Sequence, residues 1–144
     1  MDQYDAKVQF KMICAGWDCD GVLHFGRDEN GDYIPGIRPN KGDVIITGRS
    51  FEEASETYMF LQCRDDPINN AVYFNPRKFD EKSRVTSGQF KGNTIKRLNE
   101  EGKNIGIFFE DDEIQIEEIL KIVPDIRIVH VKSELVEKEN VRHR

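Results

Sequence analysis

The sequence WDCDGVLHFG, residues 17–26, places two aspartates two positions apart at the end of a largely apolar segment. Residues 8–17 predict a β-strand, so Asp18 and Asp20 lie directly at its end. Ionised carboxylates resist burial, so acids at the end of a buried strand occupy a solvated turn, hold a cation or take part in chemistry. Gly21 is typical of a turn at this position. The other segments of the chain decide between these interpretations.

The composition is that of one globular domain. With 144 residues, of which 38% are hydrophobic and 33% are charged, the chain can bury a single core. The net charge of -6 disfavours a broad basic surface for duplex nucleic acid, although a local basic groove is compatible with it.

The sequence contains no predicted signal for secretion or membrane insertion. Residues 1–10 lack a basic region followed by a long apolar run, and no window approaches the roughly 18 apolar residues of a membrane span. Cys14, Cys19 and Cys63 are odd in number and lack metal-ligand spacing, so they predict reduced thiols. We therefore expect a cytoplasmic protein without membrane association.

The segments that predict strands are short and almost entirely apolar: residues 8–17, 43–48, 71–75, 104–109 and 126–131. Asn30 and Gly31, in a polar connection, are typical of a hairpin turn. Apolar strands that alternate with helices form a parallel sheet covered by helices. We therefore predict an α/β fold, a Rossmann-like three-layer sandwich with a mostly parallel sheet of about five strands. It forms a single domain over residues 1–132, followed by a polar tail over residues 133–144.

Three helices are predicted between these strands. The first begins at Ser50, because Glu53 three residues later completes a capping box. The second runs from residue 86 or 87 to about residue 101, where Gly102 ends it. The third spans about residues 114–123 and stops before a proline.

Polar residues follow three of the predicted strands at their carboxyl ends. They are, in chain order, Asp18 and Asp20, then Thr47, Gly48 and Arg49, and finally Glu110, Asp111 and Asp112. Ligands of open parallel sheets bind beyond the carboxyl ends of the strands. Lys91, in the first turns of the second helix, is expected near the same edge. These residues are therefore predicted to converge on one site.

This set of residue types suits the transfer of a phosphoryl group to an enzyme carboxylate. An aspartate can form an acyl-phosphate, and a second acid can protonate the leaving oxygen and then activate water. Clustered carboxylates repel one another and the phosphate, and a magnesium ion with oxygen ligands removes both problems. A threonine hydroxyl, neighbouring backbone N–H groups and a lysine can hold the phosphoryl oxygens.

Four segments, DCDGV, IITGR, FKGNTIKRL and FFEDDEIQI, resemble in this order the four motifs of the haloacid dehalogenase (HAD) superfamily. They extend over residues 17–116, which is most of the chain. The resemblance implies a HAD-like fold and a phosphatase that works through an aspartyl-phosphate intermediate. It implies that Asp18 is the nucleophile and that Asp20 is the general acid and base.

The same resemblance assigns the remaining site residues. It implies that Thr47 binds the phosphoryl group, together with Gly48 and Arg49, as part of the substrate site. Lys91 would neutralise the same group.

The resemblance also implies that Mg²⁺ is the cofactor. Asp18 and the backbone carbonyl of Asp20 would bind it, together with Glu110 or Asp111. Because the fourth motif begins with Glu-Asp-Asp, the main acidic ligand is ambiguous among Glu110, Asp111 and Asp112.

Several segments, TGR followed by Phe51, FK and FFEDD, are also similar to the HAD domains of nucleic-acid repair proteins. These include polynucleotide 3′-phosphatases and the Swiss-army-knife RNA-repair group. This similarity implies a phosphorylated substrate that is a nucleotide or a nucleic-acid end. The span between Gly21 and the second strand leaves room for a flap hairpin but not for a helix or a cap domain, and residues 61–86 offer no large cap. We therefore expect a capless member with a trimmed core and an open site.

Each of these residues also has a structural interpretation. The acids can be turn residues or the acidic first turn of a helix. Lys91 competes with three other lysines for the phosphate: Lys78, Lys82 and Lys96. Arg49 binds substrate phosphate or pairs with a nearby acid. Trp17 is expected in the core, and His24 and Cys19 are expected to have no role in the site.

Two other functions fit parts of the pattern. The first is a catalytically idle HAD-like module that binds a partner protein or nucleic acid, which the trimmed core favours and the intact Asp18 and Asp20 disfavour. The second is a phosphorelay receiver domain, in which the phosphorylated aspartate ends the middle strand. Here that strand ends in Asn75, which argues against a receiver.

Overall fold

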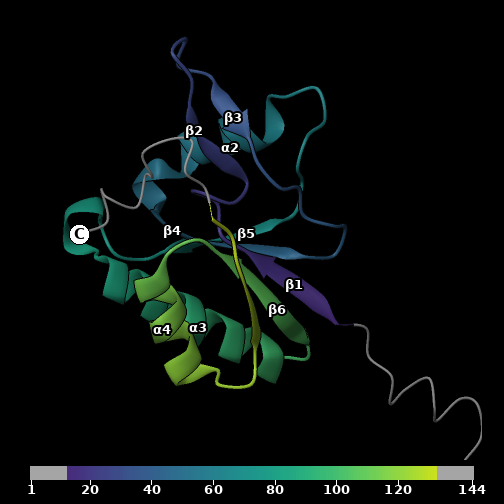
Figure 1. Cartoon of the computed structure of the whole chain (residues 1–144), viewed down its shortest axis with the longest axis vertical. Coiled ribbons are helices and arrows are strands. Elements are labelled where there is room, and N and C mark those ends of the chain that lie inside the picture. The colour runs from purple at the N-terminus through teal and green to yellow at the C-terminus, as the bar shows by residue number, and fades with distance from the viewer. Residues whose placement is uncertain (1–12, 133–144) are drawn as a thin grey trace, which may run out of the picture.

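The computed structural model describes residues 13–132, which contain a five-stranded sheet flanked by helices (Figure 1). The strands of this sheet are β1 (Cys14–Trp17), β4 (Val44–Ser50), β5 (Ala71–Asn75), β6 (Ile105–Glu110) and β7 (Arg127–His130). Their order is β5-β4-β1-β6-β7, and all neighbouring pairs are parallel. The predicted α/β fold with a mostly parallel five-stranded sheet is confirmed. The start of the first predicted strand and the predicted polar tail lie outside the described residues.

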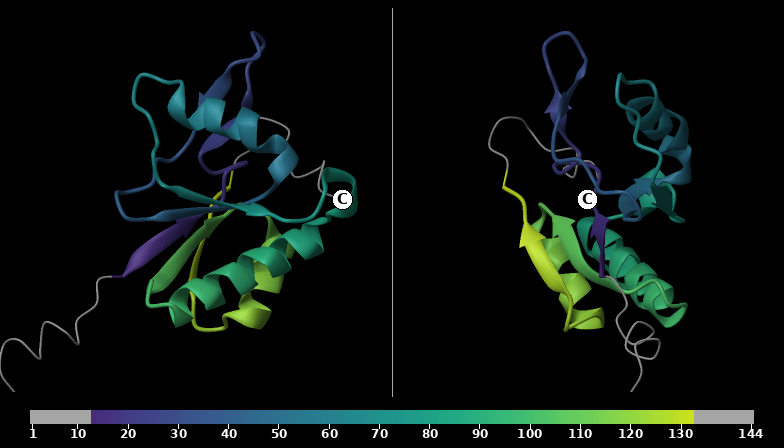
Figure 2. Two further views of the ribbon diagram at one scale, coloured as in Figure 1. Left: turned by 180° about the vertical axis from the view of Figure 1, so that it is seen from behind. Right: turned by 90° about the vertical axis from the view of Figure 1, so that its right-hand side faces the viewer.

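Helices and a hairpin cover the two faces of the sheet. On one side, α3 (Arg84–Glu100) and α4 (Glu113–Ile122) pack against each other (Figure 2). On the other side lie α2 (Ala54–Gln62) and a two-stranded hairpin of β2 (His24–Arg27) and β3 (Tyr33–Pro35). The arrangement has three layers.

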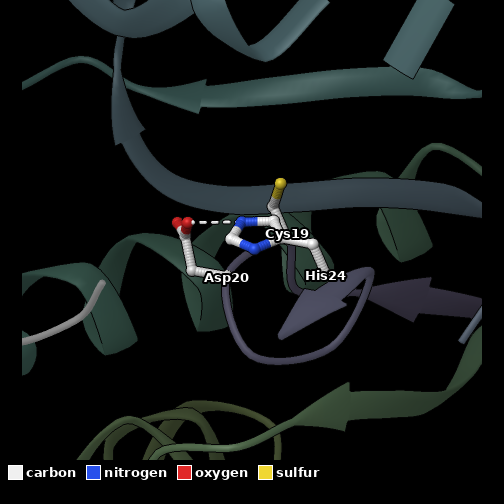
Figure 3. A group of neighbouring side chains, drawn as sticks. All are labelled: Cys19, Asp20 and His24. Carbon is white, nitrogen blue, oxygen red and sulfur yellow. Dashed lines mark hydrogen bonds and ion pairs between the residues drawn. The ribbon is translucent and has the colours of Figure 1, made fainter. Parts of the chain in front are cut away.

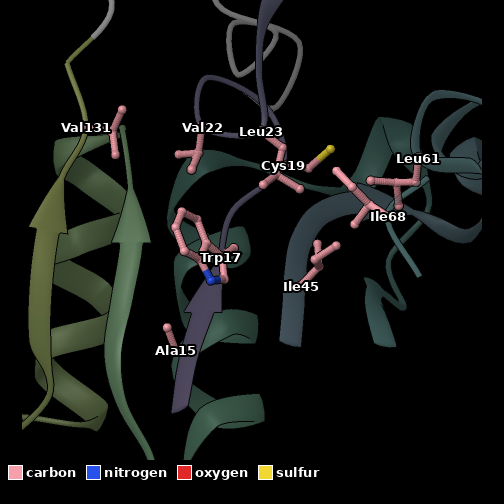
Figure 4. Close-up of a cluster of buried hydrophobic side chains, with 9 residues drawn as sticks. All are labelled: Ala15, Trp17, Cys19, Val22, Leu23, Ile45, Leu61, Ile68 and Val131. Atoms are coloured by element: carbon pink, nitrogen blue, oxygen red, sulfur yellow. The ribbon is translucent and has the colours of Figure 1, made fainter. Parts of the chain in front are cut away.

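Each face of the sheet buries its own apolar cluster, because successive side chains of a strand point to opposite faces. One cluster lies on the side of α2 and the hairpin and includes Trp17, Leu23, Ile45 and Leu61 (Figure 4). The indole ring of Trp17 stacks on Phe109 with 3.7 Å between the ring centroids. The predicted core position of Trp17 is therefore confirmed.

The second apolar cluster lies beneath α3 and α4. Val44 and Ile46, the neighbours of Ile45 in β4, belong to it, together with Ile95 of α3 and Ile119 of α4. This alternation explains why successive residues 44–46 of β4 are all apolar.

The connection from β1 to β4 contains the β2–β3 hairpin and no helix, as the short span predicted. The backbone of Gly31 adopts a positive φ of 82° in the hairpin turn, where Asn30 and Gly31 were expected to reverse the chain. Between α2 and α3 the chain forms only β5 and the single-turn helix η2 (Phe79–Glu81). Within the described residues, no helix is long and apolar enough to cross a membrane.

Two element boundaries differ from the prediction. The N-cap of α3 is Ser83, whose side chain accepts from the backbone N–H of Thr86, so Thr86 is the third helical residue rather than the first. β4 continues to Ser50, past the predicted end at Gly48. Its pairing with β5 is irregular between Thr47 and Ser50, so the predicted end of the strand is a distortion within it.

Candidate functional site

The topology brings three polar strand ends together. β1 lies between β4 and β6 in the sheet, and all three run in the same direction. The register pairs Trp17 with Phe109, and the backbone N–H of Asp18 donates to the carbonyl of Phe109 at 2.9 Å. Asp18 therefore lies beside Glu110, the next residue of β6. This is the edge at which ligands bind to open parallel sheets.

Lys91 links the first and fourth predicted motifs. Its Nζ lies 2.9 Å from Oδ1 of Asp18 and 2.6 Å from Oε1 of Glu110. The lysine comes from the buried face of α3, and only 1% of its surface is exposed. Of the four candidate lysines, Lys91 is the one that contacts the predicted nucleophile. A phosphate-binding role for it stays a prediction.

The other three lysines lie elsewhere. Lys78 and Lys96 are exposed. Lys82 is buried, and its Nζ donates to the carbonyl of Gly48 and to Glu53.

We define the acidic cluster as Asp18, Glu110 and Asp111, whose carboxylate oxygens lie within 4.8 Å of one another. All three residues are at most 4% exposed. Burial raises the pKa of Asp18 well above its ordinary value, and the neighbouring Glu110 adds to this effect. Burial likewise raises the pKa of Glu110 to about 7 and that of Asp111 to about 8. Three acids around one ammonium group leave an excess of buried negative charge, which is costly in a protein interior.

Gly21 determines how closely the acidic cluster packs. It has a positive φ of 80°, and a Cβ atom at this position would lie 2.1 Å from Oδ2 of Asp111. A side chain here would therefore collide with the carboxylate. The glycine after the second aspartate is required both by the turn and by this approach.

The acidic cluster fits a magnesium ion. Its donors are carboxylate oxygens only, which are the ligands that Mg²⁺ prefers, and their excess negative charge favours a divalent cation. Glu110 and Asp111 both belong to the cluster, so both are candidate ligands.

Asp112, the third acid of the fourth motif, has a different environment. Its side chain caps α4 by accepting from the N–H of Ile114, and it forms an ion pair with Arg84 at 2.6 Å. Burial alone would raise the pKa of Asp112, but the hydrogen bond from Arg84 and its charge lower it to about 2. The structure therefore assigns Asp112 to the helix cap.

The Asp20 carboxylate points away from the acidic cluster into a second group of residues. Nη2 of Arg49 lies 2.7 Å from Oδ1 of Asp20, and Nε of Arg49 lies 3.0 Å from Oδ2. Burial alone would raise the pKa of Asp20, but Arg49 and His24 hold it well below its ordinary value. Although Asp18 and Asp20 are two residues apart, one is pushed towards protonation and the other is held ionised.

His24 belongs to this second group, although the sequence assigned it no role. Figure 3 shows its ring facing the Asp20 carboxylate, with 2.9 Å between Nε2 and Oδ1. The backbone N–H of Gly26 donates to Nδ1, so the ring hydrogen lies on Nε2 and can donate to Asp20. The signal in the sequence was a histidine in the otherwise apolar stretch VLHF, four residues after the aspartate.

Cys19 lies beside this pair but is not poised for chemistry. Its side chain is fully buried, and burial raises the pKa of the thiol far above its ordinary value. Cys19, Asp20 and His24 are close enough to hold a metal ion. However, Asp20 and His24 already bond to each other, and a buried thiol is a poor ligand because it must first lose its proton. The acidic cluster is therefore the better candidate for a metal.

The second predicted motif, Thr47, Gly48 and Arg49, is buried at the end of β4. The backbone N–H of Arg49 donates to Oγ1 of Thr47 at 3.0 Å. The Arg49 side chain faces Asp20, so the structure favours the acid-pair interpretation of this residue. A contact between Arg49 and substrate phosphate stays a prediction.

Comparisons with protein-family models, with curated proteins and with solved structures give no match to this chain.

Proposed function

We propose that this protein is a magnesium-dependent phosphomonoester hydrolase that works through an aspartyl-phosphate on Asp18. The observation that carries the proposal is the buried acidic cluster around Lys91 at the carboxyl edge of the parallel sheet. Three ionised carboxylates buried around one ammonium group are unfavourable, so the cluster either takes up protons, as the raised pKa values of Glu110 and Asp111 indicate, or binds a cation. The four motifs that resemble the HAD superfamily supply the chemistry that this cluster suits.

In this proposal Asp18 attacks the phosphorus atom, and the bond to the leaving oxygen breaks as the new O–P bond forms. Water then cleaves the acyl-phosphate, which releases inorganic phosphate and restores the carboxylate. Asp18, Glu110 and Asp111 would hold Mg²⁺, which would neutralise the negative charge on the phosphoryl oxygens. The contact between Lys91 and Asp18 supports the proposal that Lys91 holds a phosphoryl oxygen beside the nucleophile.

Asp20 needs a proton before it can act as a general acid. The structure holds it ionised against Arg49, so proton donation requires this ion pair to loosen. A phosphate dianion would compete with Asp20 for the guanidinium group. Substrate binding is thus proposed to release Asp20 from Arg49 so that it can act as the general acid. Arg49 would then bind the phosphate of the substrate.

The idle module remains the second candidate, and the burial of the site favours it. Asp18, Thr47, Lys91 and Glu110 are each at most 4% exposed, so a substrate reaches them only after the chain rearranges. Such a module would keep its fold and its ability to bind magnesium, but it would not turn over a substrate. It would instead bind a partner protein or a nucleic acid.

A phosphatase assay separates the two candidates. The full chain is incubated with para-nitrophenyl phosphate, nucleoside monophosphates, 3′-phosphorylated oligonucleotides, sugar phosphates and a phosphopeptide, with Mg²⁺ or with EDTA. We expect hydrolysis that requires Mg²⁺ and that Asp18→Asn abolishes, whereas Asp125→Asn, at an exposed turn, retains it. Magnesium binding without turnover of any of these substrates would favour the idle module.

A further inference from the structure

The peptide bond between Gly48 and Arg49 is held on both sides by side chains. Its N–H, which belongs to Arg49, donates to Oγ1 of Thr47 at 3.0 Å. Its carbonyl, which belongs to Gly48, accepts from Nζ of Lys82 at 3.0 Å. Because the N–H and C=O of a trans peptide point in opposite directions, fixing the carbonyl also fixes the direction of the N–H.

Lys82 is itself firmly placed. Its Nζ lies 2.6 Å from Oε2 of Glu53, and its side chain is fully buried. The same Glu53 oxygen accepts from the backbone N–H of Ser50 at 2.7 Å, so one carboxylate holds both Lys82 and the end of β4. These contacts occur where β4 departs from regular pairing, between Thr47 and Ser50. Side chains therefore orient a peptide at a point where the regular pairing of the sheet is broken.

The contact determines what the Thr47 hydroxyl can do. A hydroxyl has one hydrogen to donate and two lone pairs that accept. When Oγ1 accepts from the N–H of Arg49, a lone pair is occupied and the hydroxyl hydrogen is directed elsewhere. A phosphoryl oxygen at the carboxyl edge of the sheet is an acceptor for that hydrogen.

We infer that Lys82 is a positioning residue for Thr47, which it orients for phosphoryl binding through the Gly48–Arg49 peptide. The effect of Lys82 on catalysis that we infer rests on the proposed function. The orientation of the peptide does not rest on that function, and it can be measured without substrate. Lys82 lies outside the motifs that resemble the HAD superfamily, and no contact between it and the phosphate is needed.

The first test measures hydrogen exchange of the Arg49 amide by NMR in the free protein. We expect Lys82→Met to accelerate this exchange about tenfold through loss of the fixed N–H···Oγ1 bond. Lys78→Met, an exposed lysine at the start of η2, is the matched control and should leave it unchanged. If Lys82→Met fails to fold, Lys82→Gln removes the charge with a smaller loss of polarity. Unchanged Arg49 exchange in a folded variant overturns the inference.

The second test is a double-mutant cycle with Thr47→Val, measured with para-nitrophenyl phosphate and Mg²⁺. Lys82→Met should lower kcat/KM by up to about a hundredfold in the wild-type background, because small displacements of a binding group are costly. It should have little further effect once the Thr47 hydroxyl is absent, and Lys82→Arg should restore part of the activity. Additive losses would show that Lys82 acts independently of Thr47 and would overturn the inference. If the wild type shows no turnover, the proposed function fails, while the exchange of the Arg49 amide still decides whether Lys82 holds the peptide.

Discussion

Replacing Gly21 with alanine should damage the magnesium site more than the fold. The new Cβ atom would lie 2.1 Å from Oδ2 of Asp111, and contacts under 3.0 Å essentially never occur, so the carboxylate has to move by about 1 Å. The positive φ of 80° adds a backbone penalty of roughly 1–2 kcal/mol. The carboxylate is the end of a side chain and can rotate away, so most of the collision should appear as lost metal affinity.

Gly31→Ala is the matched control for this experiment. Gly31 has nearly the same φ, 82°, but a Cβ atom there would meet nothing within 4 Å. Both variants should therefore lose similar stability in urea unfolding without metal. Only Gly21→Ala should lose magnesium affinity, by about a hundredfold, as measured by calorimetry. Equal magnesium binding by the two variants would refute the assignment of Asp111 to the metal site.

Three further predictions concern the charges of the site. Without Mg²⁺, stability should fall as the pH rises from about 4 to about 8. The reason is that Glu110 and Asp111, with pKa values raised to about 7 and about 8, bind more protons in the folded chain than in the unfolded chain. Saturating Mg²⁺ should reduce this slope in thermal melts across that range, and an identical slope would contradict the metal site. Asp18→Asn should raise the melting temperature of the metal-free protein at pH 8, since it removes a repelling charge, and a lower melting temperature would count against the acidic cluster. Arg49→Met should destabilise the fold by about 3–5 kcal/mol in urea unfolding, because the buried Asp20 carboxylate loses its ion pair with the guanidinium group. A loss below about 1 kcal/mol would indicate that this pair is exposed and weak in solution.

The sequence predicted those features that are encoded locally. The central strands β1, β4 and β6 are largely buried, so their sequences contain apolar runs. Ser50 with Glu53 identified the start of the first helical segment, η1 (Phe51–Glu53), through a short-range hydrogen bond. The parallel order of β4, β1 and β6 then required their polar ends to meet. That is why Asp18 and Glu110 could be expected in one place.

Contacts between distant segments could not be predicted in this way. The contact between His24 and Asp20 is the exception, since the two residues are four positions apart and the turn at Gly21 joins them. Arg84 meets Asp112 across 28 positions, and Lys82 meets Gly48 across 34. A lysine or arginine next to a helix start is an ordinary surface residue until the packing of the helix is known.

Trapping the phosphorylated enzyme tests the central proposal most directly. The full chain is mixed with para-nitrophenyl phosphate and Mg²⁺, reduced with borohydride and digested for mass spectrometry, because borohydride converts an acyl-phosphate to an alcohol. We expect reduction at Asp18 alone, dependent on both substrate and Mg²⁺, with Asp20 unmodified. Turnover without reduction at Asp18, or reduction at another acid, would contradict it.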